Sequence, residues 1–379
     1  MFNPSSRRQF LGGVGGVAGA LALASRSDIA LSASQSNNQS AQSATNSRPI
    51  IKPPALKSGD TIALVAPAAY AEPEEIITAK KNMERYGFKV VFGKNLAAQY
   101  GYLAGTDQQR ADDINEMFGR SDIKGIATFM GGFGCSRILP LLDYELIRNN
   151  PKVIIGHSDI TALLLGIHTQ TGLITFHGSS GLTGIGDYAI SHFQRAIMNP
   201  NTLGEVAKPT ESLAKRGHPL TTFVGGSATG ELIGGNLSLV VNLIGTAFEP
   251  DTTGKILFLE DIGEIPWRVD RMLTQLSIMG KLQAAAGFAL GPFISCIPET
   301  CAPNPQPTPA NPCECIKADP YKSFTVEEVL RQHLEPLGKP TVYNFSFGHV
   351  EENAVIPLGA IATLDATNQK LIVNENAVV

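Results

Sequence analysis

Short apolar runs alternate with segments of helical spacing through the first half of the chain, and this alternation constrains the fold more than any other feature. A short apolar run bounded by turn residues predicts a strand that is buried on both faces. The expected strands are 61–67, 89–92, 125–130 and 153–155, and the expected helices are 74–86, 107–118, 136–149 and 159–170. Strands and helices that alternate over short connections predict an α/β fold with a parallel sheet covered by helices.

The pattern changes in the second half of the chain. Residues 201–225 are polar and rich in turn formers, which is typical of a connection between domains. Beyond them, a strong strand is expected at 254–259, and a helix is expected to begin at Pro266. We therefore expect an N-terminal domain over 53–200 and a smaller, strand-rich domain of mixed α/β structure over 226–379.

The N-terminus has the sequence of an export signal. Arg7 and Arg8 precede a short apolar stretch with small residues at 22–24. This pattern is typical of a twin-arginine signal peptide, which is removed after export. We expect the signal peptide over 1–31 and a flexible polar linker over 32–52, and we expect the mature protein in the periplasm or cell envelope without stable membrane insertion. A disordered basic N-terminus is the alternative.

The charge of the chain excludes one class of partner. The formal net charge is −4, and no block of basic residues is longer than a pair. A protein that binds nucleic acid needs a basic patch to neutralise phosphates. We therefore expect no nucleic-acid partner. The sequence does not determine the oligomeric state, and a homodimer is compatible with it.

One candidate for a reactive side chain lies in the glycine-rich turn that follows the expected strand at 125–130. Three glycines precede Cys135, and a helix is expected to begin at Ser136. Glycines permit a tight turn, and the N-terminus of a helix lowers the pKa of a neighbouring thiol and offers free N–H groups. Cys135 is therefore a candidate nucleophile. The alternative is a small cysteine buried beneath the turn.

A second strand-to-helix turn, Gly156-His157-Ser158-Asp159, contains a serine that resembles the nucleophile of a Gly-x-Ser-x-Gly motif. The closing glycine of that motif is missing, because Ile160 occupies its position. Ser158 also suits the N-cap of the helix that follows. We prefer the N-cap interpretation because of the missing glycine.

Two further polar residues, Glu260 and His349, each follow an apolar run and are expected at strand ends. Acidic residues and histidines at such positions are often structural, so neither residue predicts a site by itself. The sequence has no His-Glu-x-x-His motif and no cluster of histidines and aspartates. We therefore expect no catalytic metal.

Taken in order, these segments resemble the LD-carboxypeptidase family, which includes muramoyltetrapeptide carboxypeptidases and the microcin C self-immunity hydrolases. The resemblance covers nearly all of the chain from Pro53 to the C-terminus. The matching stretches are 62–67, 101–107, 131–137, 155–164, 234–237, 256–260, 268–273 and 347–349. The resemblance implies an N-terminal parallel-sheet domain similar to class I glutamine amidotransferases and a smaller β-rich C-terminal domain.

The resemblance also implies a catalytic triad. It places the nucleophile in the glycine turn, where this chain has Cys135 and the family usually has serine, and it assigns the acid to Glu260 and the base to His349. The backbone N–H groups of Gly132 and Ser136 are the expected oxyanion hole, and no cofactor is expected. Ser136 itself is the alternative nucleophile, although a shift of one residue moves the side chain away from the apex of the turn.

The reaction that the resemblance implies is hydrolysis of the amide between an L-centre and a D-amino acid. The expected substrate is a muropeptide, and the expected leaving group is the terminal D-Ala of a murein tetrapeptide. Two alternatives remain open. One is an amidase of the microcin-immunity kind that acts on peptidyl nucleotides, and the other is a peptidoglycan-peptide-binding protein without activity.

Four of the five cysteines lie in a proline-rich insertion at 295–320. These residues are Cys296, Cys301, Cys313 and Cys315. In an oxidising compartment we expect them to form two disulfides. A zinc site is the alternative, but only one residue separates Cys313 from Cys315, whereas common zinc motifs have two.

Overall fold

The computed structural model describes residues 48–180, 186–297, 299–308, 311–317 and 323–379, without the side chains of 299–308 and 311–317. The expected signal peptide and most of the expected linker lie outside the described residues. The expected linker included Lys52, but its ammonium group binds Glu375 Oε2 at 2.6 Å. Ile51 also forms a parallel bridge with Leu173, so the folded part begins before residue 53.

A six-stranded sheet in the order β14-β5-β4-β3-β1-β2 forms the core of the first half. Strands β1 to β5 run parallel, and β14, from the far end of the chain, pairs antiparallel with β5. The strands are β1 (Thr61–Val65), β2 (Lys89–Phe92), β3 (Gly125–Thr128), β4 (Val153–Gly156), β5 (Thr175–His177) and β14 (Ile356–Leu358). The four expected strands and the parallel sheet are confirmed. The structure adds β5 and β14, each only three residues long.

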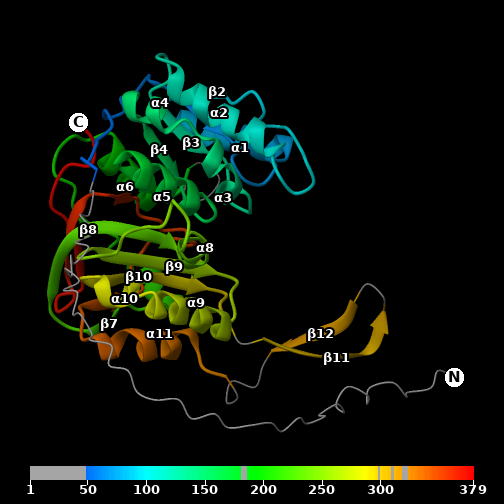
Figure 1. Cartoon of the computed structure of the whole chain (residues 1–379), viewed down its shortest axis with the longest axis vertical. Helices are drawn as coiled ribbons and strands as arrows, with labels where there is room; N and C mark the ends of the chain where they lie inside the picture. Colours follow the sequence, from blue (N-terminus) through cyan, green and yellow to red (C-terminus); the bar gives the residue numbers. More distant parts are fainter. Residues whose placement is uncertain (1–47, 181–185, 298, 309–310, 318–322) are drawn as a thin grey trace, which may run out of the picture. The chain divides into compact units, whose positions relative to one another are not determined.

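Helices surround this sheet (Figure 1). They are α1 (Pro73–Arg85), α2 (Asp107–Gly119), α3 (Cys135–Ile138), α4 (Tyr144–Asn149), α5 (Ile160–Thr171) and α6 (Asp187–Ile197). The helix expected at 136–149 is divided into α3, a 3₁₀ turn at Leu139–Leu141 and α4. Two residues explain this division: Pro140 has no N–H to continue a helix, and the Asp143 side chain caps the start of α4.

An eight-stranded mixed sheet in the order β6-β16-β15-β8-β9-β10-β13-β7 forms the core of the second half. Its strands are β6 (Gly204–Val206), β7 (Thr221–Val224), β8 (Ser227–Asn236), β9 (Ile256–Ile262), β10 (Gly287–Ile294), β13 (Thr341–Tyr343), β15 (Ile361–Asp365) and β16 (Lys370–Val373). The segment 201–225, expected as a connection, contributes β6, α7 (Glu211–Lys215) and β7. The strand-rich, mixed α/β character of this half is confirmed.

The remaining helices pack around the second sheet. These are α8 (Leu237–Asn242), α9 (Pro266–Ile278), α10 (Lys281–Ala284) and α11 (Val326–Leu334). Helices α9, α10 and α11 lie together along one side of the sheet (Figure 1). A hairpin of β11 (Glu299–Thr308) and β12 (Asn311–Lys317) leaves the same sheet after β10. In the described part of the chain, no helix is both long and apolar enough to cross a membrane.

Helix α5 and strand β8 form one of the contacts between the two halves. The hydroxyl of Thr161 accepts a hydrogen bond from the backbone N–H of Asn236 at 3.1 Å. Gly235 makes this approach possible, because a Cβ there would lie 2.6 Å from the Thr161 methyl carbon. About two turns further along α5, His168 Nε2 lies 2.9 Å from Glu231 Oε1. Helix α5 of the first half therefore lies directly against β8 of the second sheet.

Candidate active site

Glu260 and His349, the acid and base that the family resemblance implied, form a hydrogen-bonded pair. Glu260 lies on β9 and is fully buried, and His349 lies in the loop between β13 and β14. The His349 Nδ1 atom is 2.6 Å from Glu260 Oε2. Gly348 permits this contact, because a Cβ there would lie 2.5 Å from Glu260 Cγ. The strand thus presents a carboxylate to one nitrogen of the imidazole, and Nε2 is left for a reaction.

The pair is electrostatically matched for proton transfer. Burial raises the pKa of Glu260, but the hydrogen bond from His349 and the neighbouring histidines outweigh burial, so this pKa lies below its ordinary value. Burial lowers the pKa of His349, but the hydrogen bond and charge of Glu260 outweigh burial, so this pKa lies above its ordinary value. An ionised carboxylate therefore supports an imidazole that can accept and return a proton.

Two more histidines lie next to the pair, and no sequence motif predicted a role for either. The ring centroid of His157 lies 5.3 Å from that of His349, and His177 Nε2 lies 3.7 Å from Glu260 Oε1. Burial, followed by the charge of His349, lowers the pKa of His157 to about 3. Burial also lowers the pKa of His177 to about 4, so both rings are neutral near pH 7. Within the described residues, no group of histidine, cysteine or acidic side chains is arranged to hold a metal ion.

Ser158 adopts a left-handed backbone conformation at the turn between β4 and α5. Its φ is +64°, which is unusual for a residue other than glycine, and its side chain is partly exposed. The N-cap of α5 is Asp159 rather than Ser158, and it makes no side-chain capping bond. The N-cap interpretation of Ser158 is therefore wrong. A strained residue displayed at a sharp strand-to-helix turn is the arrangement of a nucleophile elbow.

Glycines in two adjacent turns make room for Ser158. A Cβ on Gly156 would lie 2.2 Å from the Thr128 hydroxyl, and a Cβ on Gly131 would lie 2.7 Å from the Ser158 Cβ. Gly131 belongs to the turn after β3, so the space that a closing glycine provides in Gly-x-Ser-x-Gly is provided here by a neighbouring strand. Gly131 lies 27 residues before Ser158 in the chain, so the spacing of Gly-x-Ser-x-Gly does not reveal it.

Cys135, by contrast, points into the core. Its side chain is 0% exposed, and its backbone N–H donates to Asp159 Oδ2 at 2.8 Å. Burial and then the charge of Asp159 raise the pKa of the Cys135 thiol well above its ordinary value. The expected lowering of this pKa is wrong, because the four-residue α3 cannot offset complete desolvation beside a carboxylate. The buried cysteine that we held as the alternative is what the structure has.

The other residues of the glycine turn have distinct surroundings. Gly132 is exposed with a φ of +103°, and its N–H remains a candidate for the oxyanion hole. The Ser136 hydroxyl donates to the Asn242 side chain on α8 at 2.6 Å, so this side chain is used to join the two halves. The buried side chain of Arg110 donates to the carbonyl oxygens of Pro67 and Gly134 and so holds the turn on its buried side.

The cysteines of the insertion are only partly described. Cys296 is a buried free thiol, 3.5 Å from the Ile294 carbonyl oxygen, so the disulfide expected for it is not present in this structure. Burial is the largest cause that raises the pKa of this thiol to about 12. Cys301 and Cys315 are opposite each other in the register of β11 and β12. The side chains of Cys301, Cys313 and Cys315 lie outside the described residues.

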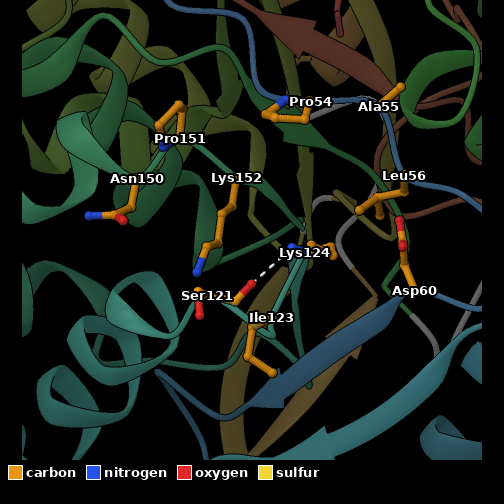
Figure 2. Close-up of a pocket in the computed structure, with 10 residues that line it drawn as sticks. All are labelled: Pro54, Ala55, Leu56, Asp60, Ser121, Ile123, Lys124, Asn150, Pro151 and Lys152. Carbon is orange, nitrogen blue, oxygen red and sulfur yellow. Dashed lines mark hydrogen bonds between the residues drawn. The ribbon is translucent and has the colours of Figure 1, made fainter.

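A cavity of about 260 Å³ lies at the amino-terminal ends of β1, β3 and β4 and is not part of this site. Figure 2 shows Lys124, Lys152 and Asp60 among its lining residues, each close to the start of a strand rather than its end. The Lys152 ammonium group donates to the carbonyl oxygens of Met117 and Phe118 and so caps α2. This lysine supports a helix end and is not free to bind a ligand.

Comparison with known proteins identifies relatives along most of the chain. Two family models match: the LD-carboxypeptidase N-terminal domain over residues 62–178 and the LD-carboxypeptidase C-terminal domain over 229–364. A probable murein peptide carboxypeptidase of Bacillus subtilis is 39% identical, over 85% of this chain and 94% of that protein. The murein tetrapeptide carboxypeptidase of Pseudomonas aeruginosa is 30% identical, over 80% of this chain and 92% of that protein.

Solved structures of similar fold include a microcin self-immunity protein and a muramoyltetrapeptide carboxypeptidase. The microcin C7 self-immunity protein MccF, in its wild-type apo state, has a TM-score of 0.72 at 26% identity and covers 87% of this chain and 100% of its own. A muramoyltetrapeptide carboxypeptidase from Oxalobacter formigenes has a TM-score of 0.65 at 26% identity and covers 82% of this chain and 97% of its own.

Proposed function

The chain belongs to the LD-carboxypeptidase family, and from this we propose that it removes a terminal D-amino acid, with D-Ala as the expected one, from murein tetrapeptides. The observation that carries the proposal is the Glu260–His349 pair beside the strained turn at Ser158. The names of relatives as murein peptide and murein tetrapeptide carboxypeptidases support the substrate class. The same pair argues against a protein that only binds peptidoglycan, since binding alone needs no buried acid–base pair.

We propose Ser158, in place of Cys135, as the nucleophile. Three observations support this: the φ of +64° at Ser158, its partial exposure, and the packing of the preceding His157 ring against His349 at 5.3 Å. Backbone strain of this kind costs on the order of 1–3 kcal/mol and persists where the surrounding structure imposes it, often at active sites. A thiol with a raised pKa and no exposure, such as that of Cys135, is a poor nucleophile.

In the proposed reaction the Ser158 oxygen attacks the carbonyl carbon of the scissile amide while His349 Nε2 accepts the hydroxyl proton. Glu260, bound to Nδ1, stabilises the imidazolium that forms. His349 then gives the proton to the leaving amine, and a D-amino acid departs with an intact amino group. Water, activated by His349, attacks the acyl-serine ester and releases the shortened peptide with a new carboxylate.

The oxyanion hole has two candidate donors in this arrangement. In a nucleophile elbow, one N–H comes from the residue after the nucleophile, which is Asp159 here, and another comes from a nearby loop. Gly131 and Gly132 form that loop, since a Cβ on Gly131 would lie 3.1 Å from the Asp159 nitrogen. We therefore retain Gly132 from the predicted pair and replace Ser136 with Asp159.

A panel of substrates tests the proposal. We expect the purified mature chain to convert a murein tetrapeptide to a tripeptide with loss of one D-Ala, measured by mass spectrometry. Murein tripeptide and pentapeptide, together with a peptidyl nucleotide, serve as comparisons. Cleavage of the peptidyl nucleotide alone would favour the microcin-immunity alternative, whereas binding of muropeptides without turnover of any substrate would favour the binding protein.

We also propose export by the twin-arginine route, motivated by Arg7 and Arg8 before the apolar stretch. Changing both arginines to lysine should leave full-length precursor in the cytoplasm, as judged by fractionation and immunoblotting. Delivery of the double variant to the envelope at the parent level would contradict this route.

A further inference from the structure

Two fully buried polar groups face each other behind the Glu260–His349 pair. His177, the last residue of β5, and Glu260, on β9, are each 0% exposed. Glu260 Oε2 binds His349, but Oε1 has no hydrogen-bond partner in the described part of the chain, and neither do the two ring nitrogens of His177. Buried polar atoms without a partner are rare, because each one costs the loss of its hydration. The distance between Glu260 Oε1 and His177 Nε2 is 3.7 Å.

We propose that His177 is a positioning residue that binds the second carboxylate oxygen of Glu260 and thereby fixes the orientation of the His349 imidazole. A shift of roughly 0.8 Å would shorten the 3.7 Å separation to the ~2.9 Å of an N–H···O bond. The inference rests on the proposed function, in which His349 is the base. Closure of the site around a substrate is the step at which we expect this shortening, since catalytic hydrogen bonds tighten in the substrate complex.

His177 is suited to donate without changing the charge of the site. Burial, which is the largest cause, lowers the pKa of His177 to about 4, so the ring is neutral and carries one N–H. With that hydrogen on Nε2, the ring donates to the ionised Glu260. A neutral donor stabilises the carboxylate and leaves its negative charge for the imidazolium of His349. A cation at the same place would compete with that imidazolium.

No other neighbour supplies this bond. His157, from the turn after β4, packs against the rings of His177 and His349, and its pKa is lowered to about 3, chiefly by burial. Asp261, next on β9, has a pKa raised to about 6 by burial and by the charge of Glu260, and its oxygens accept bonds from Asn236 and Ser238. The thiol of Cys296 also interacts with the charges of Glu260 and Asp261. None of these three groups donates to Glu260 Oε1 among the described residues.

The backbone of His177 is held by a neighbouring strand on each side. Its partner on β4 is Gly156, two residues before Ser158, and its partner on β14 is Ile356. The same strand that leads to the proposed nucleophile therefore also sets the position of His177. A hydrogen bond from His177 to Glu260 would couple the first sheet, which carries Ser158, to the second sheet, which carries the acid.

Substitutions that keep or remove a donor at the position of Nε2 test the inference. The amide of His177→Gln reaches that position, whereas His177→Met has similar size and no donor. For His177→Met we expect kcat for tetrapeptide cleavage to fall by about tenfold to a hundredfold, the effect of losing a hydrogen bond to a charged group, with KM nearly unchanged. His177→Gln should recover most of the loss.

The titration of His349, followed by NMR without substrate, is the second readout. When Oε1 lacks a donor, the pair holds its proton more tightly, so the His349 pKa and the acid limb of kcat/KM should both move to higher pH. In a Glu260→Gln background, His177→Met should add little further loss, because coupled residues are not additive. A control is His168→Met, which removes another buried histidine, bonded to Glu231, and should leave the His349 titration unchanged.

The outcomes separate the two proposals. A parent protein without activity on muropeptides contradicts the proposed function, while a shift of the His349 titration in His177→Met would still support the contact with Glu260. An active, folded His177→Met with parent kcat and an unshifted titration overturns the inference. If His177→Met does not fold, His177→Asn replaces it, because its amide reaches the position of Nδ1 rather than Nε2. Equal activity of the Asn and Gln variants would then overturn the inference.

Discussion

Two neighbouring strand-to-helix turns of the first sheet differ in which residue adopts the left-handed conformation. After β3, the positive φ angles belong to Gly132 and Gly134, and the cysteine that follows is buried. After β4, the positive φ belongs to Ser158 itself, and its side chain is partly exposed. Several glycines therefore indicate a tight turn, but they do not indicate the displayed residue. The residue that bears the strain is the better indicator of the nucleophile.

The turn after β3 also supports the turn after β4. The turn after β3 gives space at Gly131 and donates the Cys135 N–H to Asp159 at 2.8 Å. Both contacts are made with the turn after β4: Gly131 faces Ser158 itself, and Cys135 binds the next residue, Asp159. We conclude that the glycine turn shapes the elbow and that Cys135 is part of this support.

The largest expected effect separates the two turns directly. Ser158→Ala should lower kcat for tetrapeptide cleavage by roughly 10⁴-fold or more, as removal of a triad member does, without loss of folding. Cys135→Ala should keep most of the activity. The measurement is the rate of D-Ala release by each purified variant, with circular dichroism as a check of folding. The reverse result, an inactive Cys135→Ala and an active Ser158→Ala, would restore Cys135 as the nucleophile.

A smaller loss of activity is expected when a side chain is added in the turn after β3, next to Ser158. Gly131→Ala places a Cβ 2.7 Å from that of Ser158, so the nucleophile must shift. A displacement of about 1 Å can cost on the order of 10²-fold in rate. Gly186→Ala is the matched control, because a Cβ there has nothing within 4 Å. Equal kcat values for the two variants would show that Gly131 does not shape the site.

The pH dependence of activity should show the titration of His349 and no titration of a cysteine thiol. His349 acts as a base only when neutral, and Glu260 raises its pKa, so activity should fall about tenfold per pH unit once the pH is below that raised value. Glu260→Gln removes the charge that raises this pKa, so the limb should move to lower pH at a much lower kcat. Initial rates across a pH series measure both effects. An unmoved limb would mean that another group titrates.

The rate at which the Cys135 thiol is alkylated tests whether this residue is buried support or a nucleophile. Because burial and Asp159 raise the pKa of Cys135, iodoacetamide should label it slowly in the native protein and readily after unfolding. Peptide mapping by mass spectrometry distinguishes Cys135 from the four cysteines at 296–315. Native labelling of Cys135 that is faster than that of a free thiol, and that abolishes activity, is the result incompatible with a buried supporting role.

The smallest expected effects are on stability, and they differ in sign. Cys135→Ala removes a fully buried sulfur and should lower the free energy of unfolding by about 1–2 kcal/mol. Ser158→Gly relieves the left-handed strain, and it should raise that free energy by up to about 1 kcal/mol after the entropy of the unfolded glycine is counted. Urea unfolding measures both. A destabilised Ser158→Gly would indicate that the elbow is not strained.

Much of the fold could be predicted from sequence because its signals are local. The four strands at 61–67, 89–92, 125–130 and 153–155 are apolar runs with turn residues at their ends, and the structure has all of them. Strands β5 and β14 were missed because a strand of three residues is too short to show a pattern of alternating apolar and polar residues. Pro140 divided an expected helix, which a stricter use of the sequence could have detected.

The site was less predictable, because its decisive features are not properties of a sequence pattern. Glu260 and His349 were found through the resemblance, and the structure brings them together. The conformation of Ser158 and the role of Gly131 depend on the packing of two turns that are 27 residues apart, since residues 131 and 158 belong to different strand ends. His177 gave no signal either, as it is a single histidine in a very short strand.

The return of β14 to the first sheet has a consequence for biosynthesis. Strand β5 is complete at residue 177, but the strand that covers its edge is not made until residues 356–358. The nascent chain must therefore carry an unpaired strand edge while more than half of its body is still being translated, and such edges pair readily with other chains. A fragment that ends before β14 would keep that edge exposed. The two halves are thus one unit of expression, because a strand made near the end of synthesis completes the first sheet.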